Sequence, residues 1–294
     1  MVSVKEYAYA KINLYLDVLS KRDDGFHEVR TVMHTVSLCD EITVSVRTGT
    51  KPCVRLSVVG HGKLPTDARN LAVKAAELFL EATLIPAEIN IRLIKKIPVA
   101  AGLAGGSSDA AAVLRALNRA FKRPLTEKRL LALAATLGSD VPYCLLGGTA
   151  LCVGRGELIS RLPEKLDLHV VVAVSDEYVS TPVAYAELDT VYSDFKGSRT
   201  DASEQLYGEI MGAVSNGSLD GVELYNVFEK AILPICSGAE GIKNSMLTLG
   251  ATHALMSGSG PSVYGIFSDR ALAEKAKESL IKSGIRAYYA RSVK

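Results

Sequence analysis

A glycine-rich stretch, KIPVAAGLAGGSSDAAAVLRALN, runs from Lys96 to Asn118 and carries the residues best suited to bind an anion. The N-terminus of a helix presents unpaired N–H groups and about half a positive charge, and glycines before it let amides approach a phosphate. Ser107 and Ser108 would add hydroxyl donors or a metal ligand, while the helix dipole favours Asp109 in the first turn. The pattern predicts a phosphate-binding loop; the alternative is a mobile strand-to-helix connection with a serine N-cap.

Two better-known nucleotide loops do not fit this stretch. A Walker A loop needs a lysine after the last glycine, where Ser107 stands. The dinucleotide fingerprint GxGxxG fails because Ala104 occupies the place of its second glycine. A side chain with a Cβ also disfavours positive φ, so we do not expect positive φ at Ala104.

A second group of polar residues lies on the first predicted strand, in AYAKINLYLDV. Ile12, Leu14 and Leu16 alternate as a core-facing set, which leaves Lys11 and Asn13 together on the opposite face. One sheet face with an ammonium and an amide can form a wall of a substrate site. Alternatively, Lys11 is a solvated charge on an edge strand.

The turn RDDGFHE follows this strand, and its Asp-Gly pair is typical of a tight turn. Phe26 and His27 come directly after it. They can offer an aromatic platform and an imidazole to a planar base. The alternative is a packed aromatic ring and a surface histidine.

Asp140 lies in GSDVPYCLLGG between apolar flanks, where a carboxylate needs a partner or its pKa rises. Lys11 is the candidate partner, and the alternative is an Asx-type turn. A second glycine turn, in GSGPSVYGIF from Gly258 to Phe267, is either a phosphate-closing loop or a plain β-turn.

Composition bounds the class of protein. The 294 residues are 48% hydrophobic with a net charge of +2, which argues against a general nucleic-acid binder or a polybasic membrane protein. Five scattered cysteines without a CxxC pair indicate reduced thiols in the cytoplasm. We expect no signal peptide, no membrane span and no obligate protein partner.

Periodicity and turn residues predict the elements that position these groups. The first half has strands, then helices and strands around the loop; after a boundary near residue 160, helices dominate until a closing strand–turn–strand, helix and strand. We therefore predict an α+β protein with domains 1–160 and 161–294. The predicted elements of the first half are strands at 9–20, 25–38, 40–49 and 54–60, a helix at 67–83, a strand at 88–97, helices from 108 and from 127, and a strand at 148–154.

PVAAGLAGGSSDAAAVLRALN resembles the central motif of the GHMP kinases, named for galactokinase, homoserine, mevalonate and phosphomevalonate kinases. Ala104 stands where many members carry glycine. The N-terminal segment, GSDVPYCLLGGTALCVGRGE and SGSGPSVYG extend the resemblance over nearly the whole chain. It implies a ribosomal protein S5 domain 2-like N-terminal domain, a ferredoxin-like C-terminal domain and an active site between them.

The resemblance also implies residue roles in phosphoryl transfer from ATP, with Mg²⁺, to an alcohol of a small cytidyl diphosphate substrate. Lys11 and Asp140 would be catalytic; Asn13, Phe26, His27 and Tyr185 would bind the substrate, with Phe26 in place of the usual tyrosine. Ser108 would also bind the metal. The implied ATP loop comprises Val99, Ala100, Ala101, Gly102, Leu103, Ala104, Gly105, Gly106, Ser107, Ser108 and Asp109.

Two rival functions remain at this stage. Another small-alcohol kinase of the family would keep the ATP loop but should lack the DGFHE turn and the second aromatic residue. A catalytically inactive ATP-binding module should have lost Lys11 or Asp140, and both are present.

Overall fold

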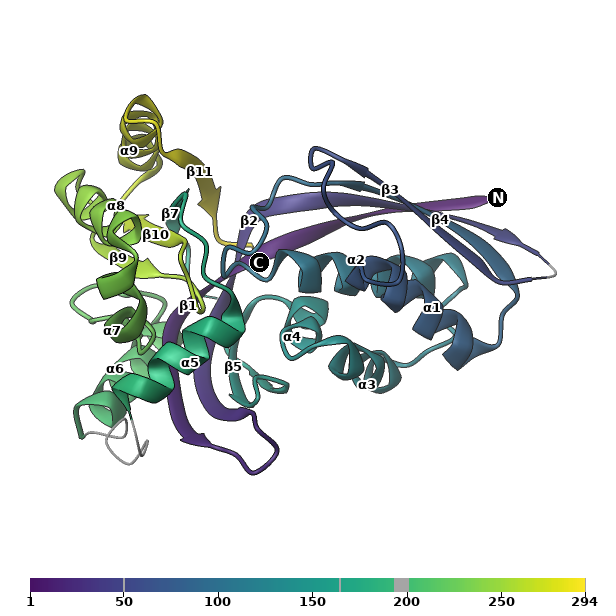
Figure 1. Ribbon diagram of the computed structural model, residues 1–294, viewed down its shortest axis with the longest axis horizontal. Helices are drawn as coiled ribbons and strands as arrows, with labels where there is room; N and C mark the ends of the chain where they lie inside the picture. The colour runs from purple at the N-terminus through teal and green to yellow at the C-terminus, as the bar shows by residue number, and fades with distance from the viewer. Residues whose placement is uncertain (50, 164, 193–200, 294) are drawn as a thin grey trace. The chain divides into compact units, whose positions relative to one another are not determined.

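The computed structural model describes residues 1–49, 51–163, 165–192 and 201–293, and it divides into two compact units (Figure 1). Each unit combines helices with mostly antiparallel strands, which confirms the predicted α+β class. The first unit comprises Met1–Ala10, Cys39–Val99 and Ala104–Gly147. The second comprises Lys11–Leu38, Ala100–Leu103 and Gly148–Lys294.

Two long strands, β1 (Val2–Lys21) and β2 (His27–Thr48), contribute residues to both units. The prediction of separate strands at 25–38 and 40–49 is wrong, because β2 runs through both. The sequence pattern suggests a turn at Asp40, but this residue lies within β2. Its carboxylate accepts hydrogen bonds from the amides of Lys96 and Ile97. The division into units thus differs from a single boundary near residue 160.

The sheet of the first unit has a parallel pair at one edge. β3 (Cys53–Val59) pairs in parallel with β4 (Ala87–Ile94), and β4 pairs antiparallel with β2. The crossover between the parallel strands is α1 (Leu71–Thr83), which lies within the helix predicted at 67–83; the parallel pairing itself was not predicted. Figure 1 shows the helices of this unit on one side of its strands. The remaining helices are α2 (Gly105–Ala120), α3 (Glu127–Leu137) and α4 (Val141–Leu146).

Local chemistry explains where these helices begin. Asn70 caps α1 by accepting from the amide of Ala72, and Thr126 caps α3 by accepting from Arg129, as predicted for Thr126. The apolar face of β4 is buried against α1 and α2 in one core. α4 was not predicted, because its six residues contain a Val-Pro pair that reads as a turn.

The second unit contains an antiparallel sheet in the order β11-β7-β10-β9. β7 is buried along nearly its whole length, which explains its continuous apolar sequence HVVVAV. The predicted closing strand–turn–strand, helix and strand are confirmed. The bounds are β7 (His169–Val174), β9 (His253–Met256), β10 (Val263–Phe267), β11 (Arg286–Arg291) and α9 (Arg270–Lys282).

Three short strands in the described part of the second unit belong to the sheet that contains β1 and β2, and its remaining helices lie between β7 and β9 in the sequence. β5 pairs antiparallel with β2 and with β6, and β8 pairs in parallel with β1. The mostly helical pattern predicted for 178–250 is confirmed where the structure describes it; residues 193–200 lie outside the described ranges. The bounds are β5 (Thr149–Gly154), β6 (Leu158–Arg161), β8 (Tyr225–Asn226), α5 (Thr181–Val191), α6 (Asp201–Asn216), α7 (Glu229–Ile232), the 3₁₀ helix η1 (Leu233–Ile235) and α8 (Ser237–Thr248).

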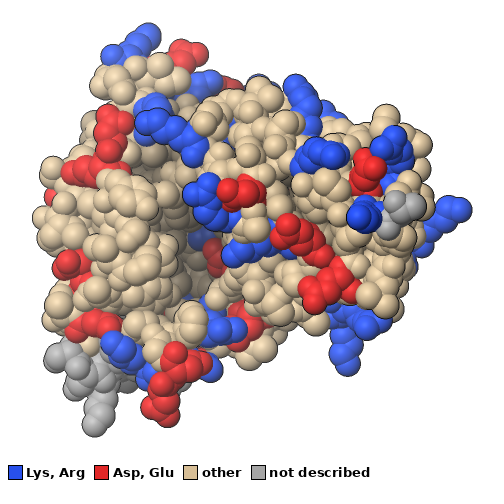
Figure 2. Space-filling model, turned by 45° about the vertical axis from the view of Figure 1, so that its right-hand side comes forward, with Lys and Arg blue, Asp and Glu red and all other residues tan. Residues whose placement is uncertain are grey.

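Basic and acidic side chains are interspersed on the face in Figure 2. This mixture agrees with the small net charge of the chain. Among the described residues, no helix is long and apolar enough to cross a membrane.

Candidate active site

The predicted phosphate loop leads directly into α2. The helix begins at Gly105, three residues before the predicted start, and Ala104 at the N-cap makes no side-chain capping hydrogen bond. Within the described ranges, the amides of Gly105, Gly106 and Ser107 donate no hydrogen bond to the protein. A Cβ built on Gly106 would meet only Leu71 Cδ1, at 3.8 Å. Open, unpaired amides at the start of a long helix fit a phosphate group.

Ala104 adopts φ 56°, so the expectation that it avoids positive φ is wrong. Ala100, at the beginning of the loop, also lies in the left-handed region, with φ 53°. This conformation costs an L-residue with a Cβ about 1–2 kcal/mol, which the rest of the fold must offset. The loop therefore keeps its backbone path without glycine at these two positions.

The side chains of Ser108 and Asp109 point into the protein. Ser108 is 1% exposed, and its hydroxyl donates to the carbonyl oxygen of Tyr9 at 2.5 Å. Its oxygen also lies 3.3 Å from Cys144 Sγ. A buried hydroxyl with this partner does not fit the predicted metal-ligand role. Asp109 is 3% exposed, so its carboxylate does not line an open loop.

Asp109 instead belongs to a buried group of three ionisable side chains that the sequence analysis missed. Lys95 Nζ lies 2.5 Å from Asp40 Oδ2 and 2.7 Å from Asp109 Oδ2. Burial raises the pKa of Asp109 to about 8, although Lys95 acts in the opposite direction. Asp109 Oδ1 is buried without a hydrogen-bond partner among the described residues. Because α2 begins at Gly105, Asp109 lies beyond the first turn in which it was predicted. A lysine just before the loop and an aspartate near the start of the helix were the available signals.

Lys11 is buried, at 4% exposure, so the alternative of a solvated edge charge is wrong. Its ammonium donates to Asn13 Oδ1 and to the carbonyl oxygen of Gly102, both at 2.8 Å. Asn13 is also engaged, because Nδ2 donates to Thr31 Oγ1 at 2.7 Å. The structure therefore brings Lys11 and Asn13 together with the residues that lead into the loop.

The second glycine turn packs against the same residues within the second unit. A Cβ on Gly102 would lie 2.0 Å from the carbonyl oxygen of Ser257, so only glycine fits there. Gly258 donates its amide to Asn13 Oδ1 at 2.9 Å, and Ser257 donates its hydroxyl to the Gly102 carbonyl at 3.0 Å. The turn therefore links β9 to β10 and also forms hydrogen bonds with Asn13 and Gly102.

Asp140 stands at the N-cap of α4, with its side chain partly exposed. It makes no capping hydrogen bond. Residues 139–140 do form a turn before the helix, as predicted, but without a side-chain capping hydrogen bond from Asp140 the turn is not of the Asx type. Asp140 belongs to the first unit and Lys11 to the second, and their pairing stays a prediction.

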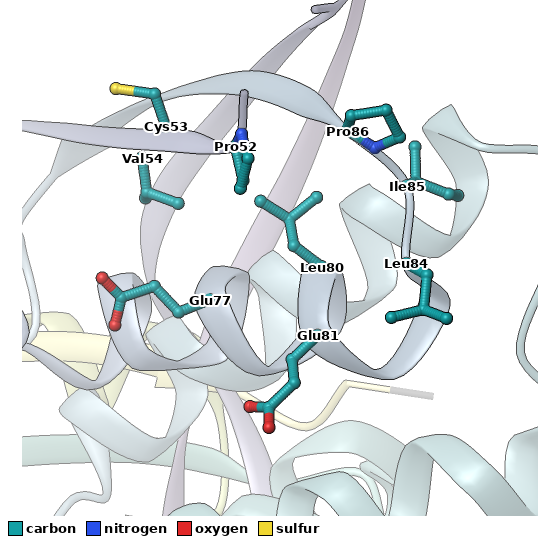
Figure 3. A pocket seen from close by; sticks show the side chains of 9 residues that line it. All are labelled: Pro52, Cys53, Val54, Glu77, Leu80, Glu81, Leu84, Ile85 and Pro86. Carbon is teal, nitrogen blue, oxygen red and sulfur yellow. The ribbon is translucent and has the colours of Figure 1, made fainter. Parts of the chain in front are cut away.

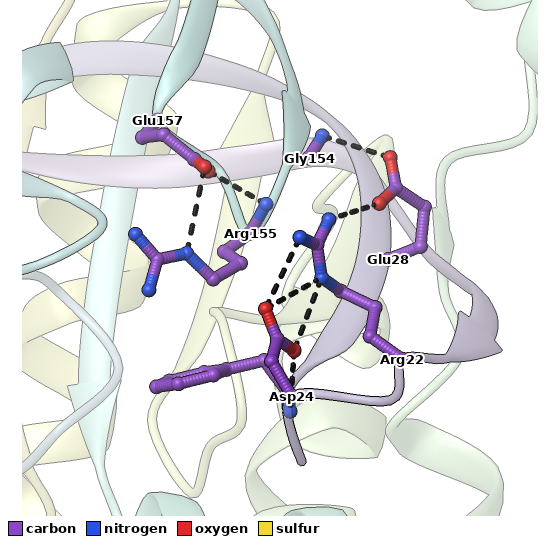
Figure 4. A network of polar contacts seen from close by, with 7 residues as sticks. Arg22, Asp24, Glu28, Gly154, Arg155 and Glu157 are labelled. Atoms are coloured by element: carbon purple, nitrogen blue, oxygen red, sulfur yellow. Dashed lines mark hydrogen bonds and ion pairs between the residues drawn. The ribbon is translucent and has the colours of Figure 1, made fainter.

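Polar contacts hold the turn that carries Phe26 (Figure 4). Arg22 contacts Asp24 and Glu28, and Glu28 accepts from the amide of Gly154 at 3.1 Å. The guanidinium of Arg155 lies 4.9 Å from the centre of the Phe26 ring, which is 51% exposed. Phe26 thus presents an accessible aromatic face on a fixed turn.

His27 is 8% exposed, so the alternative of a surface histidine is wrong. Its ring stacks on Tyr185, with centroids 4.6 Å apart and planes inclined by 26°. His27 Nε2 lies 2.7 Å from Asp189 Oδ1, and Lys21 lies 2.5 Å from the other oxygen of that carboxylate. Asp189 was missed, although it follows Tyr185 by four residues on α5, on the same helix face.

The first unit also contains a pocket of about 530 Å³ between α1 and the adjoining strands (Figure 3). None of the residues with predicted roles lines it, so it does not bear on the candidate site. The residues that line this pocket are Pro52, Cys53, Val54, Glu77, Leu80, Glu81, Leu84, Ile85 and Pro86.

Among the described residues, no group of three or more His, Cys, Asp or Glu side chains could hold a metal ion.

Comparisons with known proteins agree with the motifs. Proteins of Macrococcus caseolyticus and Gloeobacter violaceus, both named 4-diphosphocytidyl-2-C-methyl-D-erythritol kinase, are 41% and 40% identical to this chain. The alignments cover 97% and 93% of this chain and 94% and 89% of the relatives. A crystal structure of 4-(cytidine 5'-diphospho)-2C-methyl-D-erythritol kinase is similar with a TM-score of 0.79 and 32% identity, over 99% of this chain and 100% of the other.

A crystal structure of homoserine kinase from Cytophaga hutchinsonii shares the fold, with a TM-score of 0.75 and 21% identity, over 99% of this chain and 94% of the other. The family model for the GHMP kinases N terminal domain matches residues 70–148, and the model for the GHMP kinases C terminal domain matches 208–286. The predicted GHMP kinase fold is confirmed. On its near-full-length similarity to these relatives, the chain belongs to the GHMP kinase family.

Proposed function

We propose that the chain transfers the terminal phosphoryl group of ATP to the 2-hydroxyl of 4-diphosphocytidyl-2-C-methyl-D-erythritol, a step of the non-mevalonate route to isoprenoid precursors. The observation that carries this proposal is the 41% identity over 97% of the chain with a relative of that name. The DGFHE turn and Tyr185 favour a cytidyl substrate over the small alcohols of other family members.

The ATP loop is the best-supported part of the site. ATP supplies the phosphoryl group when bound. The unpaired amides of Gly105, Gly106 and Ser107 would hold phosphate oxygens, and the open space beside Gly106 leaves room for them. We retain the assignment of 99–109 to this loop through its backbone, with Ser108 and Asp109 supporting it from inside the protein.

Mg²⁺ is general in phosphoryl transfer, and we expect it here. Because the Ser108 hydroxyl is buried against Tyr9, it does not fit a metal ion in this structure. Magnesium in nucleotide sites commonly retains water and phosphate oxygens as ligands. We therefore assign no protein ligand to Mg²⁺.

The proposed chemistry uses Lys11 and Asp140. The Asp140 carboxylate would accept the proton of the attacking hydroxyl, and the Lys11 ammonium would offset negative charge on the transferred group. Phosphoryl transfer passes through a loose transition state, so position and charge matter more than a strong base. The two hydrogen bonds of Lys11 to Asn13 and Gly102 support this role, because they fix the cation in advance.

Recognition of the cytidyl group would rest on Phe26, His27 and Tyr185, with Asn13 as a further substrate contact. The exposed ring of Phe26 can stack on a base. The contact of His27 with Asp189 fixes the imidazole that would bond to the base edge.

None of the five cysteines, all in the described ranges, forms a disulfide, which supports a reducing compartment such as the cytoplasm.

A coupled assay of ADP release tests the proposal. Turnover should require 4-diphosphocytidyl-2-C-methyl-D-erythritol, and homoserine or mevalonate at the same concentration should give little. Equal or faster turnover with homoserine or mevalonate would favour another small-alcohol kinase. ATP binding without any turnover would favour an inactive nucleotide-binding module.

A further inference from the structure

Asn226 is a buried amide to which the proposed mechanism gives no role. It ends β8, the short strand that pairs with β1 at Tyr15 and Leu16, and its exposure is 3%. Its Nδ2 donates to the carbonyl oxygens of Met256 and Gly258, at 2.7 and 2.8 Å. Its Oδ1 accepts from the amide of Phe228 at 3.0 Å. One side chain thus satisfies three backbone groups.

These hydrogen bonds fix the start of the second glycine turn. Met256 is the last residue of β9, and Gly258 lies two residues further along. An amide that bridges two carbonyls so close in sequence determines the direction in which the chain leaves the strand. Glu229 supports the same point, because its Oε1 accepts from the amide of Met256 at 2.8 Å.

The second glycine turn is linked to Lys11 by the side chain of Asn13. The Gly258 amide and the Lys11 ammonium donate to the same oxygen, Asn13 Oδ1, at 2.9 and 2.8 Å. A Cβ on Gly258 would lie 3.0 Å from Lys11 Nζ and 2.9 Å from the Gly102 carbonyl oxygen. Displacement of this turn would therefore move the oxygen to which Lys11 is hydrogen-bonded.

We propose that Asn226 is a positioning residue for phosphoryl transfer: by holding the carbonyls of Met256 and Gly258, it sets the place of Asn13 Oδ1 and of the Lys11 ammonium. The inference rests on the proposed function, in which Lys11 offsets charge on the transferred phosphoryl group. Asn226 itself contacts neither Lys11 nor Asn13 in any hydrogen bond of the described structure. Its route to Asn13 is the Gly258 amide, while the Ser257 hydroxyl links the same turn to the Gly102 carbonyl.

The first test compares Asn226→Ala with a matched control, Asn118→Ala. Asn118 is also a buried asparagine, with hydrogen bonds to the backbone N–H and carbonyl of Leu125, and it lies near the far end of α2. Asn226→Ala should lower kcat by about 10- to 100-fold, since a displacement near 1 Å can cost that much. KM for ATP and for 4-diphosphocytidyl-2-C-methyl-D-erythritol should change less than about 3-fold, because the inferred role concerns the transition state. Asn118→Ala should lower Tm but keep kcat within about 2-fold.

A double-mutant cycle with Asn13→Ala separates positioning from general loss of structure. If Asn226 acts through Asn13, then Asn226→Ala should lower kcat by less than about 3-fold once Asn13 is alanine, because interacting residues are not additive. An equal factor in both backgrounds, or a kcat of Asn226→Ala within about 2-fold of wild type, overturns the inference. If Asn226→Ala is insoluble, Asn226→Ser keeps one donor and is tested in both backgrounds by the same criteria. A wild-type protein without turnover would overturn the proposed function itself.

Discussion

Lys11 donates a 2.8 Å hydrogen bond to the carbonyl oxygen of Gly102, a residue 91 positions further along the chain. Both residues belong to the second unit. Because the donor is charged, this hydrogen bond is among the stronger kinds in proteins. It joins the first strand to a residue of the predicted phosphate loop, so it restrains the position of the ammonium.

Asp140→Ala should lower kcat by at least about 100-fold, which is within the usual range for loss of a general base. Stability should change little, because the Asp140 side chain makes no capping bond to α4. The coupled ADP-release assay measures kcat, and thermal unfolding checks the fold. Asp167→Ala is the control, since Asp167 is exposed. A folded Asp140→Ala variant with near-normal kcat would remove Asp140 from this role.

Tyr185→Ala should raise KM for the cytidyl substrate by about 5- to 150-fold, which corresponds to the 1–3 kcal/mol of one stacking contact. KM for ATP should change much less. Some stability will also be lost, because Tyr185 packs edge-on against Phe228 at 4.9 Å. Tyr178→Ala is the matched control, as Tyr178 is 72% exposed. A larger change in the KM for ATP than for the cytidyl substrate would count against base stacking on this ring.

Ala104→Gly should raise the free energy of unfolding by about 0.5–1 kcal/mol. The gain is the relief of a left-handed alanine, about 1–2 kcal/mol, less the greater backbone entropy of glycine, about 0.5–1 kcal/mol. Ala112→Gly, in the interior of the same helix, should instead lower stability by about 1 kcal/mol or more. Urea unfolding of the two variants checks the opposite signs. Destabilisation by both would mean that φ 56° at Ala104 causes no strain.

Lys95→Met should lower the free energy of unfolding by about 3–5 kcal/mol at neutral pH, because the buried Asp40 carboxylate would lose its cation and Asp109 would lose a hydrogen-bond donor. Asp109→Asn should cost less, since burial already raises the pKa of Asp109 to about 8 and favours its neutral form. The exposed Lys128→Met serves as control. Urea unfolding at pH 7 gives the order. A milder effect of Lys95→Met than of Asp109→Asn would contradict this account of the three ionisable groups.

Asp17 should make stability depend on pH. Burial raises its pKa from 3.8 to about 6, although Tyr15 and the amide of Val18 donate to its carboxylate. Between pH 3.8 and about pH 6, Asp17 of the folded protein keeps a proton that the unfolded chain has released. Stability contributed by Asp17 therefore falls as pH rises through that window and is constant above it.

The variant Asp17→Asn removes this titration. Its free energy of unfolding, relative to wild type, should increase from about pH 4 to about pH 6 and then level off. Urea unfolding at several pH values measures the difference, and Asp167→Asn should show no such trend because Asp167 is exposed. A difference that stays flat across this range would show that Asp17 is not protonated in the folded protein.

The sequence predicted the features that contiguous residues determine. The strand–loop–helix order around the glycines, the cap at Thr126 and the turn before Phe26 all depend on neighbours within a few positions. Family resemblance then supplied roles for those residues.

Features that depend on distant parts of the chain were not predictable in this way. The contacts of Lys11 with Gly102 and of Asp109 with Lys95 join elements that local patterns do not connect. Asp40 and Ala104 contradict local preferences, since one remains inside a strand and the other adopts positive φ. In both cases tertiary contacts override the intrinsic tendency of the residue.

The shared strands β1 and β2 have a consequence for synthesis on the ribosome. All residues of the first unit have been made once Gly147 is added, whereas the second unit needs Lys11–Leu38 together with the C-terminal half. Domains generally begin to fold as the chain emerges. The part of β1 that carries Lys11 and Asn13 must therefore wait for its remaining partners, and its contact with Gly258 can form only after the turn between β9 and β10 has been made.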